Sequence, residues 1–497
     1  MPRVFNLSPF LLQVLSTTVA SVLSAASGMI FISLIANGLG EKEFGAYSLS
    51  TRLAAFLIPF ATLNLGIALT RYLSTISEEQ LKYRYLLAGC ILSASSVLFL
   101  ALLGYLFQKP ITHFFFHDEK YQSVFLATLF LFGTYSFYFL ISSYHLASGL
   151  IFRENCWQLL IGAIGPLLIA LFYSHPGALT TILSLQGFLY VLPTLLFFLH
   201  MFFSRPKSTV QTTCDYPYKQ LLQYGMSRLP GRFALTGLIC LPPMIATHYC
   251  SLKEVGYLVA AQSIFRLSEM GTSAFNLVAF PKFGRMLAEN QMNSAKQKVN
   301  TISSFVCDWT IFATLQLLLW SDLLVVSWLG ATYDGVASLL RILALAMGPY
   351  LFNIMLSPVI EVFEERPVNT LNLCASFLVS LACCLLLGFR WGVLGIALGS
   401  AIGFLSLGTF TIMAIRRIHK LNFRSILPSR VLLINIILLL ISICFKKLLP
   451  TLASGMPSLC LVILFGAVLL IIYYFVLRYY SHAWTIQLEC RIWQPMQ

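Results

Sequence analysis

The stretch EFGAYSL (residues 43–49) is matched about 210 residues later by EVGYLVA (residues 254–260). In both stretches an acidic residue and a glycine end a short polar turn, a long apolar run follows, and an arginine interrupts that run: Arg52 in the first and Arg266 in the second. Repetition of a whole multi-helix unit is a common way to build membrane transporters, with the substrate site where the units meet. The pattern therefore predicts two repeated units and makes the two arginines the informative residues.

The composition indicates that the chain folds in a membrane rather than in water. The chain is 58% hydrophobic, 14% aromatic and 10% charged over 497 residues, whereas soluble domains carry about 25% charged residues. A bilayer span needs roughly 20 apolar residues, so this length accommodates a dozen or more spans. We expect an all-α polytopic membrane protein.

Apolar runs separated by charged residues or Pro/Gly clusters predict about fourteen transmembrane helices, arranged as two pseudo-symmetric six-helix lobes and an added helix pair. The predicted divisions are an N-terminal lobe (1–203), a cytoplasmic linker (204–220), a C-terminal lobe (221–420) and a C-terminal helix pair with a cytoplasmic tail (421–497). With the N-terminus inside, inner segments hold about 20 of the 32 lysines and arginines and outer loops about seven. This bias predicts that both termini are cytoplasmic.

Five arginines lie inside predicted spans: Arg52, Arg228, Arg232, Arg266 and Arg341. Each costs about 2.5–3.5 kcal/mol at mid-span, so together they cost on the order of 12–18 kcal/mol. A wet cavity or charged partners would offset that cost, and we expect these residues to bind substrate as cavity cations. The alternative is that some lie near span ends and reach the interface, which fits Arg228 best.

Two intramembrane acids are candidates for ion coupling. Glu269 lies three residues after Arg266 and is close enough to neutralise it, while Asp308 lies in the middle of the ninth predicted span. Either could instead relay a proton or a cation. His113 and His117 have a spacing that could hold a metal, but phenylalanines flank them and an interfacial turn explains them better.

We expect no metal, no cofactor, no nucleic-acid partner and no enzymatic activity, because no phosphate-binding loop or nucleophilic constellation is present. The net charge of +14 is consistent with contact to anionic membrane lipid, with an anionic substrate, or with both. Pro230, Pro242 and Pro243 predict a broken seventh span, and glycines at every fourth residue from 395 to 403 predict a close-packing face.

Four short motifs carry a resemblance to a known family: GEKEFGAY (40–47), YGMSRLPG (224–231), LKEVGY (252–257) and WLGATY (328–333). They resemble polysaccharide-repeat flippases (Wzx-like) of the multidrug/oligosaccharidyl-lipid/polysaccharide (MOP) exporter superfamily, over essentially the whole chain. The resemblance implies two six-helix lobes in a V, alternating access, and export of an undecaprenyl-diphosphate-linked oligosaccharide, such as an O-antigen repeat unit, across the bacterial inner membrane. It also implies a polysaccharide polymerase and a chain-length regulator as partners.

Three alternatives stay open at this point. The lipid II flippase branch has cavity arginines on its second and eighth spans, which Arg52 and Arg266 match, but its first span carries charges and here none lies between Ser8 and Ala36. A cation-coupled multidrug exporter of the MATE type would need a cavity suited to cations, whereas guanidinium groups suit diphosphate and acidic sugars. A membrane-embedded glycosyltransferase or ligase would normally carry a large outer loop, and no long one is predicted.

Overall fold

The computed structural model describes residues 9–76, 78–203, 217–269, 292–364, 367–419 and 429–452, together with single positions within 283–289 and 464–475. Within these residues the secondary structure is helical and contains no strand. The helices are α1 (Pro9–Leu39), α2 (Glu41–Ala61), α3 (Leu65–Thr75), α4 (Glu79–Leu106), α5 (Gln108–Phe116), α6 (Gln122–Ala147), α7 (Ile151–Leu159), α8 (Gly165–Tyr173), α9 (Leu179–Phe203), α10 (Tyr218–Ala246), α11 (Leu252–Leu267), α13 (Met292–Leu329), α14 (Gly335–Ala344), α15 (Met347–Phe363), α16 (Val368–His419) and α18 (Ser429–Leu452).

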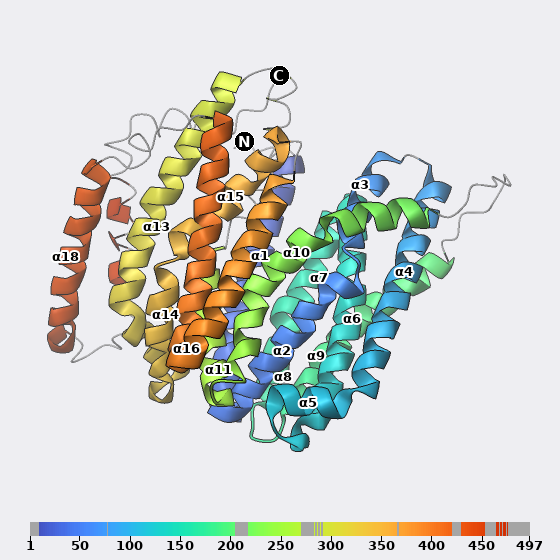
Figure 1. Ribbon diagram of the computed structural model, residues 1–497, viewed down its shortest axis with the longest axis horizontal. Helices are drawn as coiled ribbons and strands as arrows, with labels where there is room; N and C mark the ends of the chain where they lie inside the picture. The colour runs from blue at the N-terminus through green and yellow to red at the C-terminus, as the bar shows by residue number, and fades with distance from the viewer. Residues whose placement is uncertain are drawn as a thin grey trace, which may run out of the picture.

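The helices form two groups that follow the two halves of the sequence. In the first half, α6 packs against α9 and α3, and α1 packs against α7 and α8; in the second half, α16 packs against α10 and α15, and α11 packs against α14. Figure 1 shows the two groups meeting where α2 and α11 begin and diverging toward the other end. The expected all-α, two-lobed fold is therefore confirmed, while the exact domain boundaries stay a prediction.

The number of spans is confirmed only in part. Eight described helices are long and apolar enough to cross a membrane, and up to ten if each of two bent pairs, α2 with α3 and α14 with α15, forms one span. Both pairs bend by 51°. The count of fourteen stays a prediction, because most of the last predicted span lies outside the described residues.

Helix α16 covers the last part of the predicted C-terminal lobe, where two successive spans are expected. At Gly392 the backbone takes φ = 56°, which interrupts the helix. A Cβ on Gly395 would lie 2.0 Å from the carbonyl oxygen of Leu387, and one on Gly399 would lie 2.6 Å from the backbone nitrogen of Cys384. The glycine repeat is thus the face on which the two arms of α16 pack, as predicted.

Helix α10 differs from the expectation of a broken span. It is one helix with Pro230, Pro242 and Pro243 inside it, and Figure 1 shows it as a bent helix. A proline removes one backbone hydrogen bond and bends a helix without ending it where neighbouring helices support both arms. Its first residue, Tyr218, lies inside the predicted linker, of which residues 204–216 are outside the described part.

The repeated glycines are where the two halves touch most closely. A Cβ on Gly45 would lie 1.7 Å from the carbonyl oxygen of Leu252, and one on Gly256 would lie 3.1 Å from the backbone of Gly45. Glycine is required here because the backbones of α2 and α11 cross without room for a side chain. We call this region, where α2 and α11 begin, the closed end of the molecule.

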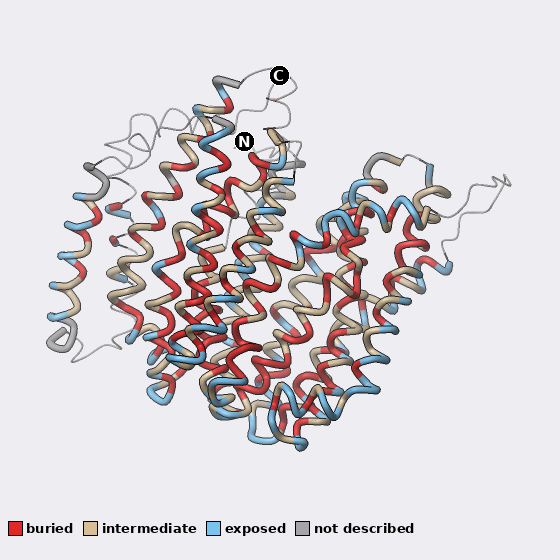
Figure 2. Tube along the Cα trace, in the orientation of Figure 1, coloured by how far each residue is buried: buried red, intermediate tan, exposed pale blue. Residues whose placement is uncertain are grey.

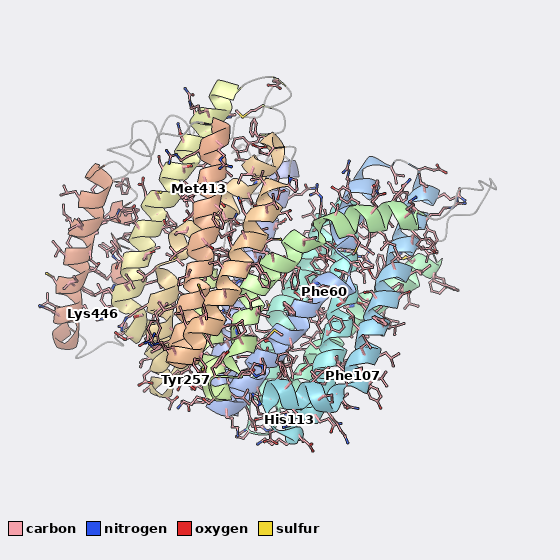
Figure 3. The ribbon with its side chains drawn as sticks, in the orientation of Figure 1. Phe60, Phe107, His113, Tyr257, Met413 and Lys446 are labelled. Atoms are coloured by element: carbon pink, nitrogen blue, oxygen red, sulfur yellow. The ribbon has the colours of Figure 1, made fainter. Side chains whose placement is uncertain are left out.

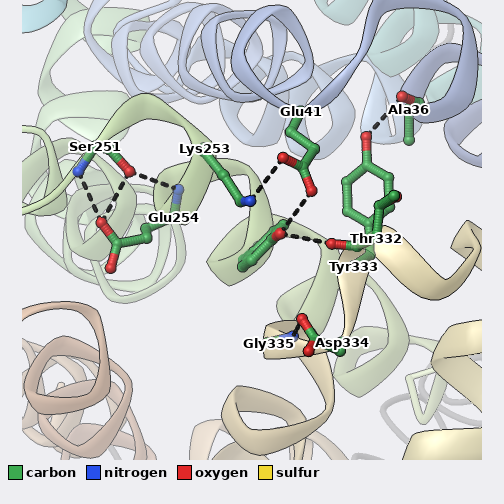
Figure 4. A network of polar contacts seen from close by, with 10 residues as sticks. Ala36, Glu41, Ser251, Lys253, Glu254, Thr332, Tyr333, Asp334 and Gly335 are labelled. Carbon is green, nitrogen blue, oxygen red and sulfur yellow. Dashed lines mark hydrogen bonds and ion pairs between the residues drawn. The ribbon is translucent and has the colours of Figure 1, made fainter.

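Polar contacts reinforce the closed end (Figure 4). Glu41 accepts a hydrogen bond of 2.8 Å from the Tyr257 hydroxyl and forms an ion pair of 2.7 Å with Lys253, and Tyr333 donates to the carbonyl oxygen of Ala36 at 2.6 Å. A capping box at Ser251 starts α11. In Figure 2 the buried residues gather where the two groups of helices meet, and α18 shows few of them.

Candidate functional site: an arginine-lined cavity

A cavity of about 550 Å³ lies between the two halves of the chain, lined by residues of α2, α3, α6, α10, α15 and α16 and by the end of α11 with the residues that follow it. Four of the five predicted arginines line it, together with two glutamates: Arg52, Arg228, Arg232, Arg266, Glu269 and Glu361. Four cations against two anions leave two positive charges on the lining. The cavity is therefore chemically suited to a ligand with about two negative charges.

Arg266 is held in a fixed orientation by its neighbours. Its Nε donates to Oε1 of Glu269 at 2.8 Å, and its Nη2 donates to Oε2 at 3.4 Å. The hydroxyl of Tyr350, on α15, donates to the same Oε1 at 2.8 Å. The ion pair expected from the three-residue spacing is thus present, and it offsets part of the cost of placing Arg266 within the membrane.

Arg52 lines the same cavity from α2, but it makes fewer polar contacts than Arg266. Its Nε is buried and has no hydrogen-bond partner among the described residues. Its guanidinium group lies near Cys240 and interacts electrostatically with Arg266 and Glu269. The two repeat arginines therefore lie close together on opposite sides of the pseudo-symmetric junction, and Arg52 keeps donor capacity for a ligand.

Arg228 and Arg232 lie on α10, and both are exposed within the cavity. The Arg228 Cζ lies 4.9 Å from the centre of the Tyr224 ring, and the Arg232 Cζ lies 5.9 Å from the centre of the Phe139 ring. Aromatic faces stabilise cations without using their hydrogen-bond donors. Both guanidinium groups therefore retain donors for an oxyanion.

The expectation that Arg341 faces the cavity is wrong. Arg341, on α14, forms an ion pair with Asp322 of α13, and Lys446 lies 3.8 Å from the same carboxylate. Figure 3 shows Lys446 at the edge of the molecule, on α18 and away from Phe60 of α2. The carboxylate neutralises Arg341 outside the cavity, so the cost of its charge is met without a ligand.

Asp308 also lies away from the cavity. It is 3% exposed within α13, and its backbone oxygen accepts a hydrogen bond of 2.6 Å from the Tyr473 hydroxyl. Its Oδ1 has no hydrogen-bond partner among the described residues. Asp308 is not among the residues that line the cavity, so its carboxylate does not contact a ligand there.

The predicted histidine turn is a contact between the two halves. The His117 Nε2 lies 2.8 Å from the carbonyl oxygen of Thr247, and the His117 ring lies edge-on to His248 with centres 5.6 Å apart. Burial and the neighbouring His117 lower the pKa of His248, which is therefore neutral at neutral pH. Among the described residues no group of three or more His, Cys, Asp or Glu side chains could hold a metal ion.

Sequence reasoning missed several polar residues of the lining. Tyr135, Cys240, Tyr350 and Asn353 all contribute to the cavity. Asn353 donates to Thr411 of α16 at 2.9 Å, which fixes α15 against α16. An asparagine inside an apolar span is a signal that sequence alone could have supplied.

Comparison with protein families places this geometry in context. The model of the family described as "Polysaccharide biosynthesis protein" matches residues 10–287, which is more than half of the chain. The chain belongs to this family. No curated protein matches the chain in a sequence search.

Solved structures show how this family member folds. The lipid II flippase MurJ in an inward closed conformation matches with a TM-score of 0.65 and 16% identity, over 94% of this chain and 99% of that one. A multidrug resistance MATE family transporter of the MOP superfamily, in an inward-facing conformation, matches with a TM-score of 0.61 and 14% identity, over 81% and 95%. The Vibrio cholerae MATE transporter VcmN in the bent form matches with a TM-score of 0.54 and 17% identity, over 83% and 98%.

These similarities establish the fold of a MOP-superfamily transporter. Together with the family match they confirm the resemblance to the polysaccharide-repeat flippases. With eight to ten described helices that are long and apolar enough to cross a membrane, the chain is a multi-pass membrane protein.

Proposed function

We propose that the protein is a flippase that moves an undecaprenyl-diphosphate-linked oligosaccharide, an O-antigen or related polysaccharide repeat unit, across the bacterial inner membrane. The observation that carries the proposal is the cavity lined by four arginines and two glutamates. The negative charges of a diphosphate would balance the two positive charges left on the lining. A guanidinium group can donate two parallel hydrogen bonds to phosphate oxygens.

The transport cycle follows from the two-lobed arrangement. With both termini in the cytoplasm, the closed end faces the periplasm and the diverging end faces the cytoplasm. The diphosphate enters the cavity, Arg52 and Arg266 hold it from the two halves, and separation of α2 from α11 opens the other side. Because the crossing at Gly45 and Gly256 is a close backbone contact, the two halves part there as rigid bodies.

The membrane potential can drive this movement. An anion that leaves a cell with a negative interior moves downhill by roughly 2.3 kcal/mol per charge per 100 mV. A diphosphate with two charges therefore gains enough free energy to make export strongly directional. On this account a polysaccharide polymerase and a chain-length regulator act on the product at the outer face.

A lipid II flippase is the second candidate, because the MurJ fold covers 94% of this chain. Both substrates share the undecaprenyl diphosphate group, so the arginine cavity does not separate them. The first helix does bear on the choice: α1 carries no charged residue, in contrast to the charges expected in the lipid II branch. A multidrug exporter for cations is disfavoured, because the lining would repel its substrate.

Deletion of the gene tests the proposal. We expect loss of one surface polysaccharide and accumulation of its lipid-linked repeat unit, identified by mass spectrometry of extracted lipids. Accumulation of lipid II with cell lysis would transfer the assignment to the second candidate. Unchanged lipid-linked intermediates with increased sensitivity to cationic drugs would overturn it in favour of drug export.

A further inference from the structure

The lining of the arginine cavity divides into two parts along its length. Arg52 lies within α2 and interacts electrostatically with Glu269, whereas Asn64 lies beyond the end of α2, at the bend that leads into α3. On α15, Tyr350 contacts Glu269, and Glu361 lies eleven residues later, about 16 Å along a helix that rises 1.5 Å per residue. The cavity therefore extends from a deep part, at Arg52 and Glu269, to a mouth, at Asn64 and Glu361.

The two parts differ in charge. Arg232 interacts electrostatically with Arg266, so the deep part contains three arginines and one glutamate and carries the two positive charges of the lining (Arg52, Arg232, Arg266 and Glu269). At the mouth one arginine, Arg228, accompanies one glutamate, Glu361, so the charges there cancel. The deep part matches a diphosphate, and the mouth matches an uncharged group attached to it.

Asn64 supplies an unpaired donor at the mouth. Its side chain contributes to the cavity lining, the residue is 2% exposed, and its Nδ2 is buried without a hydrogen-bond partner among the described residues. A buried donor without a partner is costly, and almost all such groups in proteins are paired. An acceptor on a ligand in the cavity would remove that cost.

The backbone that carries Asn64 is strained. Its φ is 52°, and that of the preceding Leu63 is 48°, although side chains other than glycine rarely adopt this left-handed region. A Cβ on Gly225 would lie 2.5 Å from the carbonyl oxygen of Leu63, so α10 packs closely against the bend and holds it. Strain of this kind is typical of binding sites, where the surrounding structure fixes a side chain in position for a ligand.

The second half of the chain supplies an oriented acceptor at the same mouth. The Asn369 Nδ2 donates to Oε1 of Glu361 at 2.8 Å, and the Asn369 Oδ1 lies 3.4 Å from the Asn353 Nδ2. Glu361 is exposed within the cavity, so its Oε2 retains the capacity to accept hydrogen bonds. The hydroxyl groups of Ser357 and Thr370 line the cavity beside it.

We propose that the mouth is a saccharide-binding subsite for the uncharged sugars that follow the diphosphate. A sugar hydroxyl both donates and accepts hydrogen bonds, so it accepts from Asn64 Nδ2 and donates to Glu361 Oε2. The Glu361 carboxylate repels acidic sugars. Because a site built to hydrogen-bond hydroxyl groups rejects ligands that lack them, these residues determine specificity. This inference rests on the proposed function and assigns the part of the substrate that the deep arginines do not contact.

Binding to the purified full-length protein in lipid nanodiscs tests the subsite with two probes. One is undecaprenyl diphosphate, and the other is undecaprenyl diphosphate linked to an oligosaccharide of uncharged sugars. The readout is the ratio of the first Kd to the second, because effects on the diphosphate cancel in it. We expect a ratio well above one for the unaltered protein.

Two variants should lower this ratio. Asn64→Gly removes the amide while glycine tolerates the positive φ, and it should lower the ratio about fivefold, the effect of one hydrogen bond between uncharged groups. Glu361→Gln should lower it about tenfold, because the lost acceptor is charged. Asn369→Ala, which removes the partner that orients Glu361, should also lower it and replaces Asn64→Gly if that variant does not fold.

Two controls separate the subsite from general effects. Glu364→Gln changes a carboxylate three residues beyond Glu361 that is not on the lining, and it should leave the ratio unchanged. Arg52→Ala should weaken the binding of both probes and keep their ratio. A variant that binds undecaprenyl diphosphate is thereby shown to be folded.

Three outcomes would overturn the subsite while the proposed function stands. They are a ratio near one in the unaltered protein, an unchanged ratio in both Asn64→Gly and Glu361→Gln, and a higher ratio in Glu361→Gln, which would show that the carboxylate repels the glycan. Failure of the unaltered protein to bind either probe would instead overturn the proposed function, and the subsite with it.

Discussion

Replacement of the two repeat arginines should affect transport unequally, and the structure gives the reason. Arg52→Ala removes a guanidinium group whose Nε has no hydrogen-bond partner among the described residues and which lies near Cys240, so the protein loses a ligand contact without losing an ion pair of its own. The charge of the cavity lining falls from two positive to one. A charge-assisted hydrogen bond is worth about 1.5–3 kcal/mol, which corresponds to an about tenfold to hundredfold loss in transport.

Arg266→Ala should be more damaging. It removes the same charge, and it also leaves Glu269 in the cavity with its 2.8 Å contact to Tyr350 but without its cation. Addition of Glu269→Gln to Arg266→Ala restores two positive charges to the lining and should recover part of the loss. Lysine at position 52 or 266 should also recover part of each loss. It supplies the positive charge but lacks the planar guanidinium group that donates to two oxygens at once.

The assay is surface glycan produced by chromosomal mutants at low expression, with protein quantity checked by immunoblot. Arg341→Ala is the matched control, because this arginine pairs with Asp322 outside the cavity, and it should retain nearly normal glycan. Normal glycan from the double variant Arg52→Ala, Arg266→Ala would refute the proposed site. Equal damage from the Arg341 and Arg52 variants would show that the losses reflect stability rather than binding.

Three further predictions concern the closed end, the buried aspartate and the topology. Gly45→Ala places a Cβ 1.7 Å from the backbone of Leu252 at the start of α11 and should shift the protein away from the described conformation. The shift is measured as increased labelling of cysteines introduced at the closed end. Gly28→Ala is the control, because no atom lies within 4 Å of a Cβ at that position. Asp308→Asn should leave transport intact, because its carboxylate does not line the cavity; abolished transport by a folded protein would make it a coupling residue after all. Reporter fusions should place Lys253 outside and Lys82 inside, and a cytoplasmic signal at Lys253 would contradict the repeat model.

The repeat was the most reliable guide to the site. The glycines at positions 45 and 256 mark the closest approach of the two halves, and the arginines that follow them line one cavity. These features are local in sequence, so pattern comparison could find them. Arg341 was misplaced because sequence spacing gives a residue's depth in a span but not the direction its side chain faces. Its partner, Asp322, lies on a different helix, and only the packing of α14 against α13 brings the two together.

Glu154 illustrates a second limit. The apolar run in this part of the sequence begins at Cys156 and leaves Glu154 outside it, whereas α7 begins at Ile151. Hydropathy moves a predicted helix end inward when polar residues occupy the first turns, although those residues are buried here by α6. The continuous path of α10 through its prolines could not be predicted either, because support from α2 and α16 decides whether a proline bends or ends a helix.

The central claim is that the arginine cavity carries a lipid-linked diphosphate between leaflets, and reconstitution of the purified protein tests it most directly. Liposomes containing undecaprenyl-diphosphate oligosaccharide are treated with an external glycosidase, and the rate at which protected substrate becomes accessible is measured. The account predicts that the protein accelerates this rate and that the double variant Arg52→Ala, Arg266→Ala loses most of the acceleration, while Arg341→Ala keeps it. A rate equal to that of protein-free liposomes, or an undiminished rate in the double variant, would contradict the account.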